Sequence, residues 1–574
     1  MYRIVPVAAI VLWSAAVFAQ AAGESESPTA QRPDDAAPWA AAPAPGGGAE
    51  PEAPAPGGGA EPEAPAPERA AAPERAAAPE RAAAPKRPAA PESHSDFIDT
   101  RLNFTFTNEN VLADPNETHV PNVPGYRFGR PNQLGTLFFD NYDTRFSGFE
   151  TLSHAVLYKR HSAGNWDVEG ALVLRVNDLA ERDIRLSDAG SYIRVARWAD
   201  AERRSPARVS LTAFPTSSDR FRLGYSYRLS WGGSNEYQRT KNAVPGVKLQ
   251  WENDRVYAFV GAKSAVLVDD TIDEERSVFA YLAGAGVDVT DMLRVEVNGG
   301  YFDRGTNEQE DVRSEHVQLF GASVQVALQQ GIPVGSSIDY KLYRNDLESI
   351  RTLFRQKDEY PGGFAWMVAS EATVLGQTLK DPAAPGTTTI QYAFAGDVNV
   401  RAKLDYTRFR VDLQYRDAAY ILHSAPSLPS YVDFADDYEL TPNFFAAAGV
   451  DHHYPGPNLT TGIVLGLELP ATIASPKPIV EVDQVSAGEA VYVIRAEGDY
   501  TILPPGEKAL PQLAAKFTAR LDFADDRFAS ILDVYYSRDP NRTRLRRDGP
   551  EDLLQYEFDD FNQLGFNLTL QARF

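Results

Sequence analysis

The sequence predicts an all-β fold, a closed antiparallel transmembrane β-barrel that follows a long N-terminal segment of different composition. Three observations predict it. Polar and apolar residues alternate in runs of about ten residues, the length that a tilted strand needs to cross a bilayer. Aromatic residues make up 11% of the 574 residues although the mean hydropathy is −0.35, a combination that a bundle of membrane helices would not show. Short polar connections alternate with long acidic ones.

The first 21 residues have the pattern of a cleavable signal peptide. Arg3 supplies a positive charge, residues 4–18 are mostly apolar, and Ala19-Gln20-Ala21 places small residues at a cleavage site. A membrane anchor is the alternative, but an apolar stretch of about fifteen residues that contains Pro6 is short for a span. We therefore expect export and removal of residues 1–21.

Residues 22–94 are predicted to be a disordered tether in the periplasm. An eleven-residue unit rich in Pro, Gly and Glu starts at Ala42 and recurs at Ala53, and six-residue Pro-Glu-Arg-Ala-Ala-Ala units follow from Pro67. Such repeats bury no large apolar side chain, so they cannot offset the entropy of ordering. Extended at about 3.1 Å per residue, the segment reaches on the order of 200 Å. It therefore either contacts the cell wall or an inner-membrane partner, or is an inert spacer.

Residues 95–574 are predicted to form the barrel. The most regular alternation is at 221–231, where Phe221, Leu223 and Trp231 share one face with other apolar residues and Arg222 lies on the other. Further strands are predicted at 97–107, 166–177, 245–251, 293–301, 390–404, 409–415, 513–523, 528–536 and 564–574. Hydrocarbon leaves no backbone group unpaired, so the sheet must close, with apolar side chains toward lipid and polar ones inside.

The predicted strand number is even, roughly 16 to 22, with 18 as the central value. The connections suggest it, because tight turns at one end of an outer-membrane barrel alternate with longer loops at the other. The assignment of connections to alternate ends fails around residues 376–408 and again around 470–510. The sequence therefore predicts the architecture and leaves individual strands there unassigned.

The last strand carries the most specific motif in the chain. One face is apolar and ends in a terminal aromatic residue: Leu564, Phe566, Leu568, Leu570, Ala572 and Phe574. The segment resembles the final strand of the bacterial outer-membrane β-barrel superfamily, whose C-terminal Phe is recognised by the barrel-assembly machinery. The resemblance implies a porin-like barrel in the outer membrane, contact with its lipid and lipopolysaccharide, and the assembly machinery as a partner during biogenesis. It indicates no particular family.

Basic residues are frequent on the predicted polar faces, although the net charge is −23. The candidates for a selective lumen are Arg101, Arg175, Arg222, Arg228, Arg294, Arg401, Arg410, Arg416 and Arg520. Fixed positive charge in a lumen raises the local concentration of anions, whereas pairing with acids across strands would only stabilise the interior. Residues 345–360 have helical spacing and could fold into the pore or lie in an outer loop.

These features favour a channel for small hydrophilic solutes, anions included. The alternative is a plugged barrel that serves as an adhesin, receptor or structural protein, and a membrane-embedded hydrolase is less favoured. The net charge argues against a nucleic-acid partner, and the absence of Cys excludes disulfides, thiolate metal sites and a lipid-modified N-terminus. The oligomeric state stays open.

No catalytic site, metal site or cofactor is expected. Adjacent residues of a strand point to opposite faces, so His452 and His453 after Asp451 should not share one ligand sphere. The acidic run 269–275 lacks the Gly and the spacing of a calcium loop and is interpreted as a solvated charge run. No nucleophile elbow, phosphate-binding loop or zinc-binding helix motif is present.

Overall fold

The computed structural model describes residues 96–107, 125–128, 153–179, 184–188, 190–226, 229–237, 240, 243–269, 274–331, 363–479, 489–496, 499–524, 527–548, 553–559 and 561–574. These all belong to one compact unit of the chain. The expected signal peptide and tether, and the expected helix at 345–360, lie outside the described residues. No helix in the described ranges is long and apolar enough to cross a membrane.

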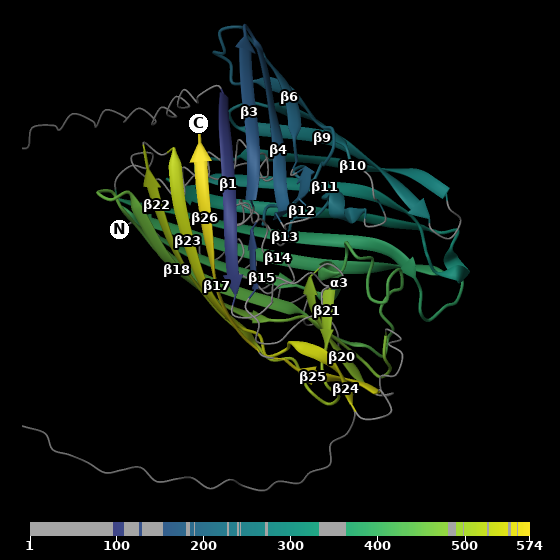
Figure 1. Ribbon diagram of the computed structural model, residues 1–574. Helices are drawn as coiled ribbons and strands as arrows, with labels where there is room; N and C mark the ends of the chain where they lie inside the picture. The colour runs from purple at the N-terminus through teal and green to yellow at the C-terminus, as the bar shows by residue number, and fades with distance from the viewer. Residues whose placement is uncertain are drawn as a thin grey trace, which may run out of the picture. The chain divides into compact units, whose positions relative to one another are not determined.

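The described strands form a closed antiparallel ring of 18 (Figure 1). β1 (Asp96–Thr107) closes it, because it pairs with β3 (Ser153–Ala163) on one side and with β26 (Asn562–Arg573) on the other. The remaining members are β4 (Trp166–Leu179), β6 (Tyr192–Trp198), β7 (Arg208–Phe214), β8 (Gly246–Glu252), β9 (Val256–Asp269), β10 (Glu274–Asp288), β11 (Leu293–Thr306), β12 (His316–Gln330), β13 (Phe364–Lys380), β14 (Thr388–Leu404), β15 (Thr407–Arg416), β17 (Asn443–Tyr454), β18 (Leu459–Leu469), β22 (Gln512–Phe523) and β23 (Phe528–Arg538). The closed fold and the central value of 18 are confirmed.

Two short strands extend the ladders at one end of the ring. β2 (Gly125–Phe128) pairs with the second half of β1, and β5 (Ile184–Asp188) pairs with the second half of β4. On the same edges, β3 pairs with the first half of β1 and β6 with the first half of β4, so β2 and β5 add no further members to the ring.

Both ends of the barrel chain meet at one rim, called here the terminus end. The backbone N–H of Ile98 donates to the carbonyl of Phe574, and the N–H of Phe574 donates back, each at 2.8 Å. Most connections at this end are brief, such as 164–165, 253–255 and 405–406, whereas the connections at the opposite end include 215–245 and 470–511. Residues 199–207 and 331–363 are longer connections at the terminus end.

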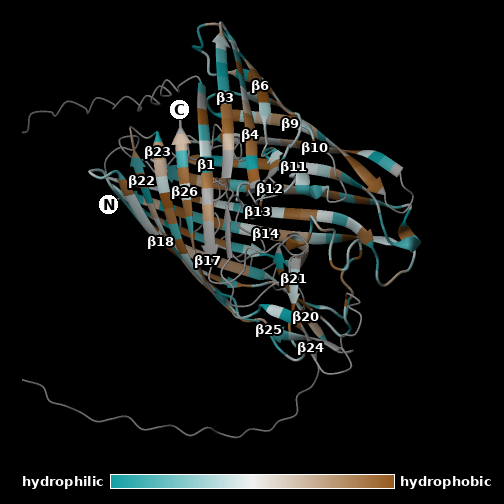
Figure 2. Ribbon diagram, in the orientation of Figure 1, coloured by the Kyte–Doolittle hydropathy of each residue, from teal (hydrophilic) through white to brown (hydrophobic). Residues whose placement is uncertain are grey.

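Side chains on the ring alternate between an outward apolar face and an inward polar face. On β8, the outward Trp251 is 43% exposed while the inward Lys248 is 2% exposed. Figure 2 shows the same alternation of hydrophobic and hydrophilic residues along the long strands. Exposed apolar side chains around a polar interior are the reverse of a soluble barrel. The expected direction of the two faces is confirmed.

Exposed aromatic side chains gather in two zones of the outward face. Those near the terminus end are Trp166, Trp251, Phe364, Tyr454, Phe523 and Phe574, and those nearer the opposite end include Tyr392, Phe394, Phe444 and Tyr536. Aromatic girdles of this kind mark the two interfaces of a membrane. The outward surface is therefore built to cross a bilayer.

The strand predicted at residues 221–231 is wrong. Its described residues, 221–226 and 229–231, are irregular and buried on both sides, and the chain bends at Gly224 and Gly232, whose φ angles are +83° and +77°. Its apolar side chains pack inside the barrel, where the ring of Phe221 stacks 6.0 Å from Phe214 and Trp231 lies 5.9 Å from Phe302. Alternation reveals two different environments, but it does not tell which one is lipid.

A small sheet outside the ring explains the miscounted strands at 470–510. It contains β16 (Glu439–Thr441), β19 (Thr472–Ser475), β20 (Ala490–Ala496) and β21 (Asp499–Ile502). A separate hairpin joins β24 (Thr543–Asp548) to β25 (Leu553–Phe558). The difficulty at 376–408 has another cause, because β13 and β14 each run for 17 residues and leave no room for a further strand.

Candidate functional site: a polar constriction inside the barrel

Two segments from the connections at the opposite end fold against the inward faces of the ring. The first inward segment is residues 218–226 and 229–237 between β7 and β8, and it includes the short helix η1 (Ser234–Glu236). The second inward segment is residues 417–428, which begin with α3 (Ala418–Ile421). The two are joined where the Tyr420 hydroxyl donates to the carbonyl of Leu229, at 2.5 Å.

The first inward segment is fastened to the barrel wall by side chains of four strands. The Glu371 carboxylate on β13 accepts the N–H groups of Tyr225 and Ser226, at 2.8 and 2.6 Å. On β9, the Lys263 ammonium donates to two carbonyls of the segment, including that of Gly232 at 2.6 Å. Asn298 on β11 accepts the N–H of Gly224, and Ser323 on β12 accepts the indole N–H of Trp231. Wall side chains thus satisfy backbone groups that an irregular buried segment would otherwise leave unpaired.

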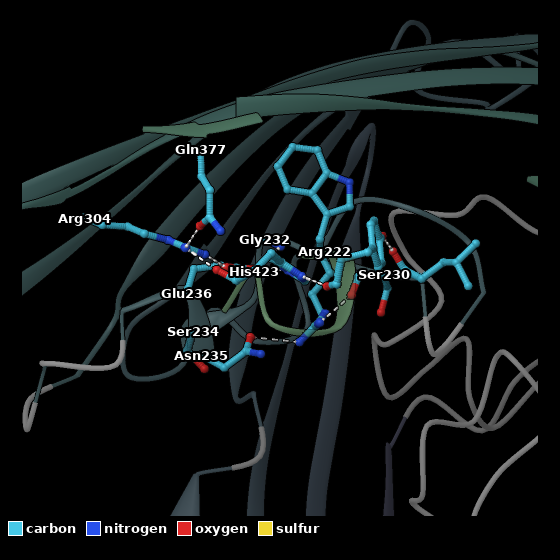
Figure 3. Close-up of polar contacts among 12 residues, drawn as sticks. Arg222, Ser230, Gly232, Ser234, Asn235, Glu236, Arg304, Gln377 and His423 are labelled. Carbon is cyan, nitrogen blue, oxygen red and sulfur yellow. Dashed lines mark hydrogen bonds and ion pairs between the residues drawn. The ribbon is translucent and has the colours of Figure 1, made fainter. Parts of the chain in front are cut away.

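Glu236 is the hub that joins both inward segments to the wall (Figure 3). Its Oε1 accepts the N–H of Gly232 at 2.8 Å and lies 3.1 Å from Nε2 of His423, in the second inward segment. Its Oε2 forms an ion pair with the Arg304 guanidinium on β11. Arg304 also donates to Gln377 on β13 and to the carbonyl of His423, so one buried cluster connects both inward segments with β11 and β13.

The cluster is held in its charged form. Burial alone would raise the pKa of Glu236, but the charges of His423 and Arg304 outweigh it and hold that pKa well below its usual range. Nδ1 of His423 lies 2.5 Å from the carbonyl of Tyr420, which can only accept. The imidazole of His423 therefore bridges this carbonyl and the Glu236 carboxylate.

Most of the predicted lumen arginines are on inward faces and have polar partners. Arg294 pairs with Asp288 at 2.5 Å, Arg520 with Asp522 at 2.9 Å, and Arg416 lies 3.8 Å from Glu468. Arg175 donates to Ser187 and Arg401 to Asn399, while Arg101 is buried on β1 and Arg410 is partly buried on β15. Pairing with acids, the alternative considered from the sequence, therefore describes several of them.

Arg222 is not a strand residue as predicted. Arg222 belongs to the first inward segment, where its guanidinium contacts Asp219 at 3.2 Å and donates to the carbonyl of Ser230 at 2.6 Å. Arg228 lies outside the described residues. Arg222 therefore lies inside the barrel because its segment bends inward, and not because it is part of a membrane-crossing strand.

Neighbouring inward positions of β14 and β15 bring like charges together. Arg401 is the register partner of Arg410, and Lys403 is the partner of Arg408, which also pairs with Asp451 at 2.5 Å. On the far side of β15, Arg410 faces Gly449, where an added Cβ would lie 2.8 Å from Nε of Arg410. The glycine therefore leaves room for the guanidinium. Like charges directly opposite each other destabilise a sheet, which makes this basic wall a candidate for function.

Sequence reasoning missed Glu236, Arg304, Glu371 and the role of His423. Gly232-Gly233 and Pro245 were the available signals, since they mark a turn rather than a membrane strand. The separation of His452 and His453 is confirmed, as His452 contacts Thr407 and His453 contacts Thr460 from the two faces of β17. Within the described ranges, no group of three or more His, Asp or Glu side chains could hold a metal ion.

The chain is a transmembrane β-barrel. No known family model matches its sequence, and neither does any curated protein. Solved structures with a similar arrangement include OpdQ of Pseudomonas aeruginosa, with 9% identity and a TM-score of 0.38 over 83% of this chain and 97% of that one. The outer membrane protein OprD of the same species has 10% identity and a TM-score of 0.36, over 84% and 94% of the two chains. The assignment therefore rests on strand pairing and exposure in this chain itself.

Proposed function

We propose that this protein is an outer-membrane channel for small hydrophilic solutes, with a preference for anions, narrowed by two inward segments. The observation that carries the proposal is the ring of 18 described strands with a polar inward face. A barrel of about 16 to 18 strands encloses more space than its own side chains fill, whereas one of about eight strands does not. The inward segments then determine how much of that space a solute can use.

The basic wall on β14 and β15 supports the preference for anions. Arg401, Lys403, Arg408 and Arg410 form two facing pairs of like charge on the inward face. A positive potential inside a low-dielectric wall attracts anions and offsets part of their dehydration. Like charges opposite each other destabilise a sheet, and a role in transport would account for their presence here.

The terminus end is proposed to face the periplasm. Its connections are mostly brief, as at the periplasmic rim of outer-membrane barrels, and the predicted tether would leave from this end. The proposed assembly signal is Leu564, Phe566, Leu568, Leu570 and Phe574, of which Leu564, Leu570 and Phe574 are exposed on the outward face. Outer-membrane lipid and lipopolysaccharide are the proposed surroundings.

Ion selectivity of the refolded protein in a planar bilayer tests the channel. We expect stepwise conductance and a reversal potential of anionic sign in a salt gradient. Replacing the facing pair as Arg401→Gln with Arg410→Gln should move the reversal potential toward cations, because the positive potential along the path falls. Arg544→Gln is the control, since Arg544 pairs with Glu557 in the hairpin outside the ring. An unchanged reversal potential in the double variant would remove the basic wall from the solute path.

A plugged barrel with a receptor, adhesive or structural role is the second candidate. The dense burial of both inward segments favours it, since Trp231 and Tyr420 are almost fully buried. Bilayers that contain the folded protein and stay silent would support this candidate. We propose no catalytic role for Glu236 and His423, because Oε1 of Glu236 and both ring nitrogens of His423 already make the contacts that join the inward segments.

A further inference from the structure

An unneutralised arginine lies on the lipid-facing surface at the terminus end. Arg197 is the second-last residue of β6 and is exposed on the outward face, in line with the exposed Ile193. In the described part of the chain, no carboxylate pairs with its guanidinium, whose one recorded contact is an aromatic ring. A charge in this position needs either water or an anion from the membrane.

One exposed indole lies against this arginine, and a second lies two strands away at the same level. The guanidinium carbon of Arg197 lies 5.5 Å from the centre of the Trp166 ring, and the two residues are register partners across β4 and β6. On the other side, Arg197 is the partner of Val209, which in turn is the partner of Trp251. Both tryptophans belong to the aromatic zone at the terminus end, so Arg197 lies at the level of the lipid headgroups.

Five basic side chains on the strands and connections next to Arg197 have carboxylate partners. Arg160 and Arg203 share Asp167, at 2.8 and 2.5 Å. The outward Lys159 pairs with Asp96 at 3.1 Å, and Arg204 and Arg208 pair with Glu202 and Glu252. The cations around Arg197 are thus neutralised within the protein, whereas Arg197, which faces lipid, is not.

We propose that Arg197, held against Trp166, binds the phosphate of an anionic phospholipid in the leaflet at the terminus end. A guanidinium donates two parallel hydrogen bonds to a phosphate, and stacking on an indole fixes its plane while its edge stays free to donate. The choice of a phospholipid over lipopolysaccharide rests on the periplasmic orientation proposed above. The bound lipid would anchor this sector of the rim at a fixed depth in the membrane.

Native mass spectrometry in a neutral detergent tests this site with phosphatidylglycerol and phosphatidylcholine as probes. The full chain should retain one phosphatidylglycerol in preference to phosphatidylcholine by about fivefold, the effect of one Arg near an anionic surface. Arg197→Gln should abolish the preference, and Arg197→Lys should keep part of it because the charge remains without the bidentate geometry. Trp166→Leu should weaken it with the charge intact.

Arg204→Gln is the matched control, because Arg204 lies on the same rim but pairs with Glu202. Each variant is first shown to be folded by its heat-modifiable electrophoretic mobility. Equal preference in wild type and Arg197→Gln, or equal losses in Arg197→Gln and Arg204→Gln, would overturn the proposal. Silent bilayers with an intact lipid preference would count against the channel alone, and conduction without a preference would count against the lipid site alone.

Discussion

Glu236 is a fully buried carboxylate whose partners come from two other elements and from its own segment. Replacing it as Glu236→Gln keeps the shape but leaves the Arg304 and His423 charges without their counter-ion. Removing one partner of a buried ion pair costs about 3–5 kcal/mol. We therefore expect a lower thermal midpoint and larger current fluctuations, as the inward segments loosen. Glu202→Gln, which breaks an exposed pair with Arg204, should change either quantity little.

The same carboxylate gives the fold a pH dependence of known sign. Its pKa in the folded protein is below the ordinary value of 4.5, so its ionisation stabilises the fold above that value. This stabilisation is lost as the pH falls from 4.5 through the folded value. The difference in thermal midpoint between wild type and Glu236→Gln should therefore shrink on acidification. A difference that stays constant down to strongly acidic pH would contradict the role of Glu236 as an ionised hub.

At the scale of elements, the N-cap of α3 is a carboxylate whose burial opposes its ionisation. The Asp417 carboxylate accepts the N–H of Tyr420 at 2.6 Å and that of Phe394 at 2.7 Å. Burial nevertheless raises the pKa of Asp417 from 3.8 to about 7. Because the folded pKa is the higher one, its contribution is fully present below pH 3.8 and is lost as the pH rises through about 7.

Asp417→Asn should remove this loss, because the amide oxygen still accepts the N–H of Tyr420 at the N-cap but carries no charge, although the amide NH2 cannot accept the N–H of Phe394. The expected result is a variant whose thermal midpoint rises relative to wild type between pH 4 and pH 7. Asp417→Ala is the control, since it removes the charge and also the cap, at about 1 kcal/mol. A parallel pH profile of wild type and Asp417→Asn would show that Asp417 does not titrate in this range.

Strands with one lipid face and one polar face could be predicted from the sequence, and the inward segments could not. On β8 or β26 the two-residue period has a single interpretation, because neighbouring strands pair along their full length. The alternation around Leu223 and Trp231 is equally regular, but its apolar side finds Phe302 and other residues inside the barrel. Whether an apolar side contacts lipid or the barrel interior depends on how the whole ring closes, and a short stretch of sequence carries no information about that.

At the scale of the whole molecule, the ring could be predicted from the sequence and the candidate site could not. The closed ring follows from the two-residue alternation and from the membrane, because hydrocarbon requires every backbone group to be paired. The candidate site depends on contacts of long sequence separation, such as Glu236 with His423 and Tyr225 with Glu371. Neither Glu236 nor Glu371 lies in a strand predicted from the sequence, and neither gave a sign of such a partner. The arginines could therefore be predicted as inward residues, while the hub could not.

Shortening the first inward segment tests whether it sets the width of the channel. Replacing residues 219–236 by a short Gly-Ser linker removes the hub and the aromatic side chains that fill the interior, while the ring keeps its pairing between β7 and β8. A wider path should raise the single-channel conductance severalfold, and anion preference should persist because Arg401 and Arg410 stay on the wall. The matched control shortens the β24–β25 hairpin, which pairs outside the ring. If the folded variant conducts like wild type, the first inward segment does not constrict the path, and the limiting width must lie in the second.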